Sequence, residues 1–187
     1  MAIAGIDFVV GDAKNLPPRP SIRSNARAKR APLLASRRRS MEIRPVTRAD
    51  RDEWLRMRTR LYPGSAPEEI DEWLDSDEGT LLVGVAVFVA DRGDGRLAGF
   101  VEIGLRNYAE GCVTTPVAFL EGWYVDPDVR RLGVGTRLVQ AAEEWARARG
   151  LEEIASDTTL DNAVSLEAHL ALGFEEVERQ ICFRKTL

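Results

Sequence analysis

The sequence predicts an α/β domain with a mixed sheet and helices on both faces. Two apolar, β-rich runs at residues 80–90 and 97–105 are joined by Asp-Arg-Gly-Asp-Gly, which indicates a hairpin of antiparallel strands. A third run, at 117–125, leads into an amphipathic helix, and a fourth run, at 151–156, follows that helix. A strand–helix–strand unit of this length forms a right-handed crossover, so these two strands should be parallel.

The elements before the hairpin are predicted from capping signals. Residues 42–46 are typical of an opening strand, and Thr47-Arg48-Ala49-Asp50 is a capping box that begins a helix. Pro63-Gly64 ends that helix, and Pro67 opens a second, shorter one. Three tryptophans at helical core spacing are assigned to packing: Trp54, Trp73 and Trp145.

The elements after the hairpin follow the same logic. A loop at 107–116 precedes the third strand, and the amphipathic helix that begins near Val134 ends near Gly150. A further helix is predicted over 161–172, and residues 174–185 are predicted to be strand.

The segment between the third strand and its helix indicates an anion site. It reads Arg130-x-x-Gly133-x-Gly135, and both glycines are expected to remove Cβ atoms where the backbone bends around a ligand. The first N–H groups of the following helix have no partner within it, and they coincide with the positive pole of the helix dipole. The third glycine of a dinucleotide fold and the lysine of a nucleotide triphosphatase are both missing. A glycine-rich turn that serves packing alone is the alternative.

Composition indicates a single catalytic domain. The chain has 187 residues, of which 44% are hydrophobic and 30% charged, and its longest apolar run is far below the roughly 20 residues of a membrane span. Cys112 and Cys182 show neither metal-ligand spacing nor a disulfide framework. We therefore expect no metal, no membrane insertion and a cytoplasmic location.

Charge divides the chain into two parts. Residues 1–40 contain nine basic and two acidic residues, a net charge of +7, which leaves 17 basic and 28 acidic residues, −11, from residue 41 onward. The first part is expected to be a disordered extension, because it offers little apolar surface to bury. It is interpreted as a nucleic-acid or anionic-surface arm, a targeting segment, or upstream sequence not translated in the cell. The third interpretation is favoured, since Met41 directly precedes the first strand.

Two motifs in the predicted order carry a family resemblance. Arg130-x-x-Gly133-x-Gly135 resembles the pyrophosphate loop of the GNAT superfamily of acyl-coenzyme A-dependent N-acyltransferases, and the segment from Asn162 to Phe174 resembles the family's Asn-x-x-Ala-x-x-x-Tyr-x-x-x-Gly-Phe helix. Segments around Tyr62, Glu121 and Asp157 are similar to chromosomally encoded aminoglycoside 6′-N-acetyltransferases. The resemblance covers residues 41–187. It implies a GNAT fold, with a mostly antiparallel sheet and a parallel central strand pair.

The resemblance also implies the ligand contacts. Acetyl-CoA is the implied co-substrate, held by Trp123, Tyr124, Val125, Arg130, Arg131, Leu132, Gly133, Val134, Gly135, Thr136 and Asn162. The implied acceptor pocket is formed by Tyr62, Ser65, Tyr108, Glu121, Asp157 and Glu178. The family tends to have Trp in place of Tyr62 and His in place of Ser65. The contact of Trp123 is expected to use its backbone, with the ring in the core.

Three residues are candidates for catalysis: Asp157, Glu121 and His169. Transfer from a thioester requires an uncharged amine, a polarised carbonyl and a thiolate that can leave. Asp157 or Glu121, directly or through water, is expected to accept the amine proton; the alternatives are a cap for Asp157 and a solvated charge for Glu121. His169 occupies the position of the tyrosine that many GNAT enzymes use as an acid, and its alternative is a packing residue.

The predicted function is acetyl transfer to the 6′-amino group of aminoglycosides, an activity of the antibiotic-resistance type. The charge of −11 favours a substrate with several amino groups and disfavours nucleic acid. The alternatives are acetylation of another small amine or a protein amine, and a non-catalytic acyl-CoA sensor. Strand pairing through residues 174–185 predicts a homodimer.

Overall fold

In the computed structural model, which describes residues 41–75 and 84–187, five strands form one sheet in the order β1-β2-β3-β4-β5. The strands are β1 (Glu42–Pro45), β2 (Ala86–Asp91), β3 (Leu97–Arg106), β4 (Val117–Val125) and β5 (Ile154–Ser156). Neighbouring strands are antiparallel except β4 and β5, which are parallel. The predicted fold class and the crossover are confirmed.

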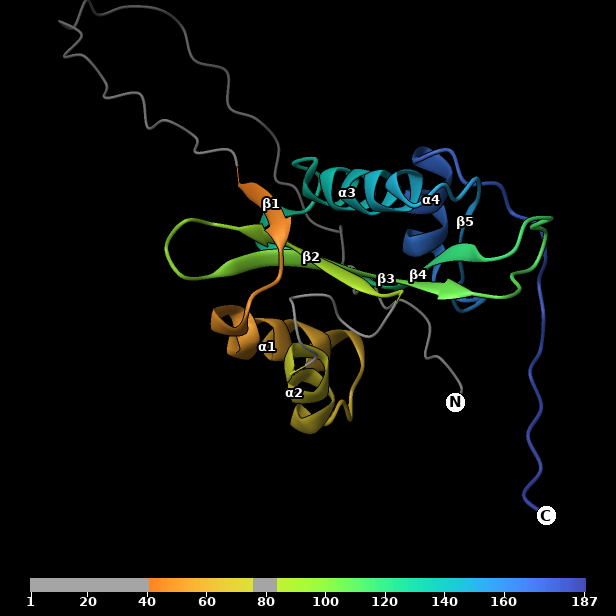
Figure 1. Cartoon of the computed structure of the whole chain (residues 1–187), viewed down its shortest axis with the longest axis horizontal. Coiled ribbons are helices and arrows are strands. Elements are labelled where there is room, and N and C mark those ends of the chain that lie inside the picture. Colours follow the sequence, from red (N-terminus) through yellow and green to blue (C-terminus); the bar gives the residue numbers. More distant parts are fainter. Residues whose placement is uncertain (1–40, 76–83) are drawn as a thin grey trace, which may run out of the picture.

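Helices cover both faces of this sheet, with α1 and α2 on one side and α3 and α4 on the other (Figure 1). They are α1 (Arg51–Leu61), α2 (Pro67–Asp75), α3 (Val134–Ala148) and α4 (Ala163–Ala171), with short 3₁₀ turns at Arg48–Asp50 and Pro127–Val129. Trp54 and Met57 of α1 and Leu138 and Val139 of α3 are buried in one continuous core. Each helix therefore buries its apolar stripe against the sheet.

The hairpin departs from its predicted bounds at one end. β2 begins at Ala86, because Gly84 adopts a φ of 97° in a turn just before it, and the predicted residues 80–83 lie outside the described part. β3 extends one residue further than predicted, to Arg106.

The pairing of β4 creates the opening in which the site lies. Glu102 pairs with Gly122 and Ile103 with Leu120, so Glu121 is an extra residue in a β-bulge. On its other side, β4 pairs with β5 only from Ala118 to Leu120. Between Glu121 and the end of β4, no strand pairs with this second edge among the residues that the structure describes.

The predicted strand at 174–185 is wrong for the isolated chain. The C-terminal segment, residues 174–187, forms no strand; residues 174–182 line a cavity beside α4, and the chain then leaves the domain in an extended form (Figure 1). Its alternating pattern is that of a strand, yet Val177, Ile181 and Phe183 are exposed. A strand needs a neighbour that pairs with its N–H and C=O groups, and residues 41–75 and 84–173 provide none here.

Two other expectations concern the N-terminal extension and membrane insertion. The proposed extension, residues 1–40, lies outside the described residues. Within residues 41–75 and 84–187, no helix is both long and apolar enough to span a bilayer.

Candidate active site

The cofactor loop, which we define as residues 126–133, connects β4 to α3. It passes through the 3₁₀ turn and then through Arg131 and Gly133, whose φ angles of 62° and 80° lie in the left-handed region. Such a conformation is uncommon for arginine and is often found at functional sites. The loop delivers the chain to the N-terminus of α3, where unpaired N–H groups favour an anion.

The two glycines of the motif have different structural reasons. A Cβ at Gly133 would meet nothing within 4 Å, so glycine is favoured there by its positive φ. A Cβ at Gly135 would lie 2.8 Å from Cζ2 of Trp123. The expectation that Gly135 makes room for a ligand is therefore incomplete, because the buried indole of Trp123 already requires glycine at this position.

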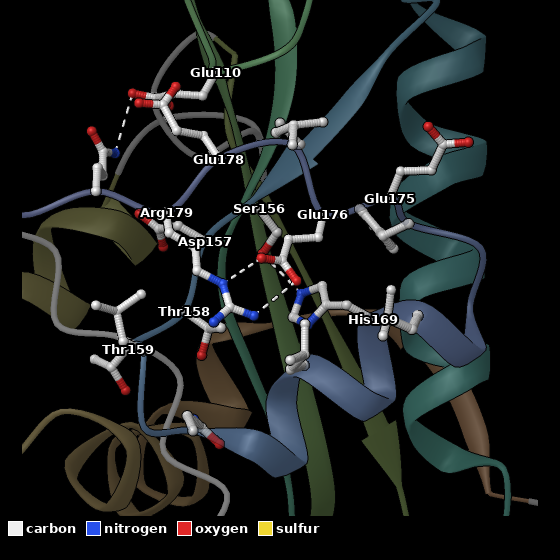
Figure 2. A pocket seen from close by; sticks show the side chains of 18 of the residues that line it. Glu110, Ser156, Asp157, Thr158, Thr159, His169, Glu175, Glu176, Glu178 and Arg179 are labelled. Carbon is white, nitrogen blue, oxygen red and sulfur yellow. Dashed lines mark hydrogen bonds and ion pairs between the residues drawn. The ribbon is translucent and has the colours of Figure 1, made fainter.

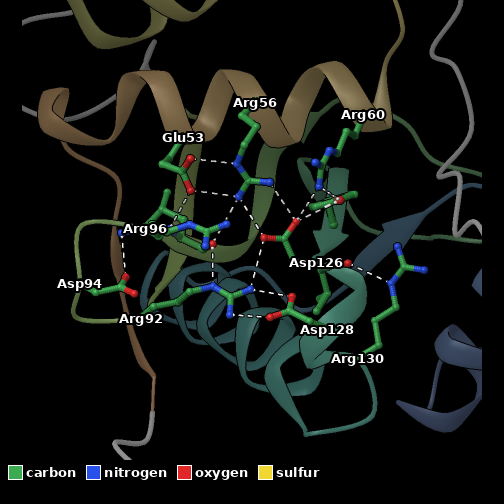
Figure 3. Close-up of polar contacts among 12 residues, drawn as sticks. Glu53, Arg56, Arg60, Arg92, Asp94, Arg96, Asp126, Asp128 and Arg130 are labelled. Atoms are coloured by element: carbon green, nitrogen blue, oxygen red, sulfur yellow. Dashed lines mark hydrogen bonds and ion pairs between the residues drawn. The ribbon is translucent and has the colours of Figure 1, made fainter.

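The start of the cofactor loop is fixed by a buried carboxylate. The Asp126 cluster consists of Asp126, Arg56, Arg60 and Arg92, which Figure 3 labels, and of Tyr124. Asp126 is 3% exposed, and its two oxygens accept from Arg56 Nη1 and Nη2 at 3.0 and 2.9 Å. Arg60 and Arg92 donate at 3.2 and 3.3 Å, and the Tyr124 hydroxyl at 3.2 Å. Helix α1 and the β2–β3 hairpin are thus tied to the first residue of the loop.

The remainder of the cofactor loop makes fewer side-chain hydrogen bonds than Asp126 does. Asp128 accepts from Arg92, and Arg130 Nε donates to the Val125 carbonyl at 3.0 Å (Figure 3). Contact between Arg130 and a phosphate therefore stays a prediction. The predicted cofactor residues Arg131, Leu132 and Thr136 are exposed at the loop and at the start of α3.

A buried polar atom without a partner fits the predicted coenzyme A site. The carbonyl of the Asn162 side chain accepts from Ser165 N at 3.1 Å and caps α4, whereas its buried Nδ2 has no partner among the described residues. An orphaned buried donor is costly unless a ligand or water meets it. Together with the cofactor loop and the edge of β4 that no described strand joins beyond Leu120, Asn162 fits an amide-rich, phosphorylated cofactor.

An acidic cavity opens beside the cofactor site. This acceptor cavity, of about 540 Å³, lies between the end of β5, α4 and the C-terminal segment (Figure 2). Two of the predicted acceptor residues, Asp157 and Glu178, line it together with Glu110, Glu175 and Glu176. Arg179 is held by Glu176 through a double contact.

Asp157 faces solvent within these walls. Loss of water around its carboxyl raises the pKa of Asp157, Arg106 opposes this shift, and Glu121 and Glu110 add to it. A carboxylate with a raised pKa and an open face is suited to accept a proton near neutral pH.

The second candidate base, Glu121, is already paired. Arg106 Nε and Nη2 donate to its two oxygens at 3.0 and 2.6 Å. Glu121 is therefore a less available base than Asp157.

Three other predicted acceptor residues lie outside the cavity lining. The hydroxyl of half-buried Tyr62 donates to the backbone carbonyl of Glu121, and burial raises the pKa of Tyr62. The Ser65 hydroxyl donates to the Tyr62 carbonyl at 3.0 Å, which closes the turn between α1 and α2. Tyr108 is 67% exposed on its loop. Of these three residues, Tyr62 contacts Glu121, and the stacking of Tyr62 or Tyr108 on a sugar ring stays a prediction.

The surroundings of His169 favour a neutral imidazole. Nδ1 lies 2.8 Å from the Ser165 carbonyl, which can only accept, so Nδ1 carries the proton. Nε2 then accepts from the Ser156 hydroxyl at 3.0 Å (Figure 2). Burial lowers the pKa of His169, and its ring packs edge-on against Trp123 and Phe174. This geometry favours the packing role over that of a general acid.

Comparison with known proteins agrees with this arrangement. The profile of the acetyltransferase (GNAT) family matches residues 47–174. The chain belongs to the GNAT family. Over 146 residues, 78% of this chain and 96% of the relative, it is 50% identical to aminoglycoside N(6′)-acetyltransferase type 1 of Klebsiella aerogenes. The protein of that name from Serratia marcescens is 43% identical over 73% of this chain and 92% of its own length.

Solved structures extend the likeness to the GNAT fold. AAC(6′)-Iy in complex with the bisubstrate analogue CoA-S-monomethyl-acetylneamine superposes with a TM-score of 0.70, 37% identity, and coverage of 79% of this chain and 99% of that one. AAC(6′)-Ih from Acinetobacter baumannii superposes with the same TM-score at 34% identity, again over 79% and 99% of the two chains.

Sequence reasoning missed three charged residues of this GNAT domain. Arg106 pairs with Glu121, Asp126 gathers three arginines, and Glu102 is buried against Trp54 Nε1 at 3.0 Å and Arg58 Nε at 3.1 Å. A charged residue in an apolar strand is the only signal for Glu102, whose burial raises its pKa to about 7. The partners of Arg106 and Asp126 depend on the bulge and on the packing of α1, which no local pattern encodes.

Proposed function

We propose that this GNAT domain transfers the acetyl group of acetyl-CoA to the 6′-amino group of an aminoglycoside. One observation carries the proposal: the unpaired edge of β4 runs from the cofactor loop toward an acidic cavity that Asp157 lines. The relatives named above support the substrate class.

The cofactor is held by the chain's own backbone in this proposal. The N–H groups at the start of α3 bind the diphosphate, the edge of β4 at Trp123–Val125 pairs with the pantetheine amides, and Asn162 Nδ2 donates to the same arm. Acetyl-CoA, when bound, supplies the thioester. The β4 N–H groups beyond the bulge are suited to polarise its carbonyl.

The acceptor is oriented and deprotonated at the other end. Asp157 attracts the ammonium, accepts its proton directly or through water, and so exposes the lone pair of nitrogen. Nitrogen then bonds to the acetyl carbon, the carbon–sulfur bond breaks, and nitrogen passes its second proton, through water, to the leaving thiolate, so that the neutral amide and the thiol of coenzyme A are formed. We assign the base to Asp157 because Glu121 is bound to Arg106.

The acidic wall favours a substrate with several cationic groups. Glu110, Glu175, Glu176 and Glu178 line the cavity with Asp157, so a polyamine would be concentrated there. Another polyamine or a basic peptide is the runner-up on this evidence, and nucleic acid is disfavoured.

Thiol release tests the function. With acetyl-CoA present, we expect release with kanamycin and tobramycin, and only with those gentamicin components that possess a free 6′-amine. Release with spermidine or a basic peptide alone would favour the runner-up. Binding of acetyl-CoA without release for any acceptor would favour a sensor.

We also infer that two copies associate through the C-terminal segment. Its alternating pattern and exposed Val177, Ile181 and Phe183 suit pairing with the sheet edge of a second chain. Light scattering should give a dimer for the wild type and a monomer for Phe183→Asp. We also propose a cytoplasmic location. We propose that the GNAT domain begins near Met41, and the mass of the native protein tests this boundary.

A further inference from the structure

The Arg106–Glu121 pair has a geometry that an ordinary surface ion pair lacks. Both side chains are 26% exposed, and the guanidinium uses two nitrogens to bind both carboxylate oxygens. Its Cζ also lies 3.3 Å from the centre of the Phe119 ring. A stacked, bidentate arginine is held in one orientation, unlike a solvated lysine or arginine.

The pair lies next to the proposed base. Phe119, on which Arg106 stacks, lines the acceptor cavity together with Asp157. Glu121 occupies the bulge at which β4 loses its pairing with β5, and Asp157 directly follows β5. Arg106, on β3, and Glu121, on the adjacent β4, therefore act on Asp157 with opposite signs of charge.

We propose that Arg106 is a positioning residue of the acceptor site, which keeps Glu121 in a closed ion pair so that Asp157 receives the substrate's ammonium. The proposal rests on the proposed function. It explains why Asp157 and Glu121 need not compete for the proton of the substrate's amine, since Arg106 neutralises Glu121.

The electrostatics of the site agree with this division. After the loss of water, Arg106 is the largest influence on the pKa of Asp157, which it lowers, whereas Glu121 raises it. The two partners therefore shift the pKa of Asp157 in opposite directions. Other charged or titratable groups face Asp157 from the loop, α1, α4 and the C-terminal segment: Glu110, Tyr62, His169, Glu176, Glu178 and Arg179.

Opposite shifts from the two partners provide the test. Arg106→Gln removes the cation and leaves Glu121 uncompensated, so the pKa of Asp157 should rise by roughly half a unit to one unit. Glu121→Gln leaves Arg106 uncompensated, so the pKa should fall by a similar amount. The double variant should return close to the wild-type value, and Arg106→Lys, which keeps the charge, should stay close to it.

Carboxyl ¹³C NMR of the full chain, without cofactor or drug, measures these shifts. Incorporation of ¹³C-labelled aspartate gives the signals, and Asp157→Asn assigns the relevant one. Shifts of opposite sign would support the proposal. Equal shifts in both single variants, or no shift in either, would overturn it, because the two charges would then not act separately on Asp157.

Turnover separates this proposal from the proposed function. Wild-type acetylation of kanamycin decides the function by itself, whereas the NMR titration requires no substrate. If kanamycin is acetylated, kcat/KM for Arg106→Gln should fall several-fold at pH 6 and recover toward pH 8, with KM for acetyl-CoA unchanged. A loss that is independent of pH would contradict the role of Arg106.

Discussion

The C-terminal end of β4 and the region beside its bulge, which we call the cofactor end and the acceptor end of the site, handle charge in opposite ways. At the cofactor end, Asp126 is almost fully buried, and three arginines and a tyrosine satisfy it. At the acceptor end, Asp157 and Glu178 line an open cavity, and part of its wall is a segment without secondary structure. One end is closed by the chain's own cations, and the other presents negative charge.

This difference follows from what each end must bind. The same cofactor is used in every turnover, so a loop ordered in advance lowers the entropic cost of binding it. A polycationic acceptor brings its own positive charge, so carboxylates that have no arginine partner can attract and orient it. The contrast predicts that substitutions at the two ends will affect different kinetic constants.

The largest effect is expected at Asp157. Asp157→Asn keeps the shape but cannot accept the amine proton, so kcat should fall about 10²- to 10⁴-fold. Calorimetry should find the Kd of acetyl-CoA unchanged. Asp161→Asn is the matched control, an exposed carboxylate four residues away, and should retain activity. Wild-type turnover by Asp157→Asn would remove this residue from the chemistry.

A smaller effect on turnover is expected at the cofactor end. Asp126→Asn leaves Arg56 and Arg92 with one charged partner fewer, which should cost about 3 kcal/mol of the free energy of unfolding. Because the cofactor loop loses its tie, KM for acetyl-CoA should also rise roughly tenfold, with kcat and the drug's KM little changed.

Asp50 provides the control for Asp126. It is 8% exposed, and Arg44 donates to its two oxygens at 2.7 and 2.8 Å, but it lies on the β1 side of the sheet. Asp50→Asn should lower the melting temperature similarly while the KM for acetyl-CoA stays constant. If both variants raise that KM equally, the Asp126 cluster only stabilises the fold.

Glu102, which pairs with Gly122 next to the bulge, is expected to affect the pH dependence of stability rather than binding. Its buried carboxyl has a pKa raised to about 7, so the native state binds more protons than the unfolded state between the unfolded pKa and pH 7. Stability should therefore fall as pH rises through this window, by on the order of 3 kcal/mol at most. Glu102→Gln should remove that fall in urea titrations at pH 5 and 8. An identical pH dependence in both proteins would show that Glu102 stays charged.

The elements that were predicted correctly are those with local signals. The limits of β4 and the glycine loop follow from an apolar run and a turn, and the capping box at Thr47 marks the first helix, with Asp50 accepting from Thr47 N at 2.8 Å. Helix α4 follows from apolar spacing, although it begins at Ala163 rather than at residue 161, and it ends at Ala171, shortly before Gly173 with its positive φ of 91°.

The site was less predictable because its contacts are long-range. Arg56 and Asp126 are 70 positions apart, and the pairing of Arg106 with Glu121 depends on a one-residue bulge. The tautomer of His169 depends on Ser156 and Ser165, which only the packing of α4 on β5 brings together. The predicted C-terminal strand failed for a related reason, since periodicity indicates a capacity to pair but cannot supply the neighbour.

The smallest effect is expected from Glu178, on the exposed C-terminal segment. Glu178→Gln removes one charge from the cavity wall, and an exposed charge contributes at most about 1 kcal/mol, so KM for kanamycin should rise no more than about fivefold. The effect should shrink in about 0.5 M salt, where screening shortens its range. Glu42→Gln, an exposed carboxylate on β1, is the control and should leave KM unchanged. Equal effects from both substitutions would mean that net charge, rather than the placement of carboxylates at the acceptor end, attracts the substrate.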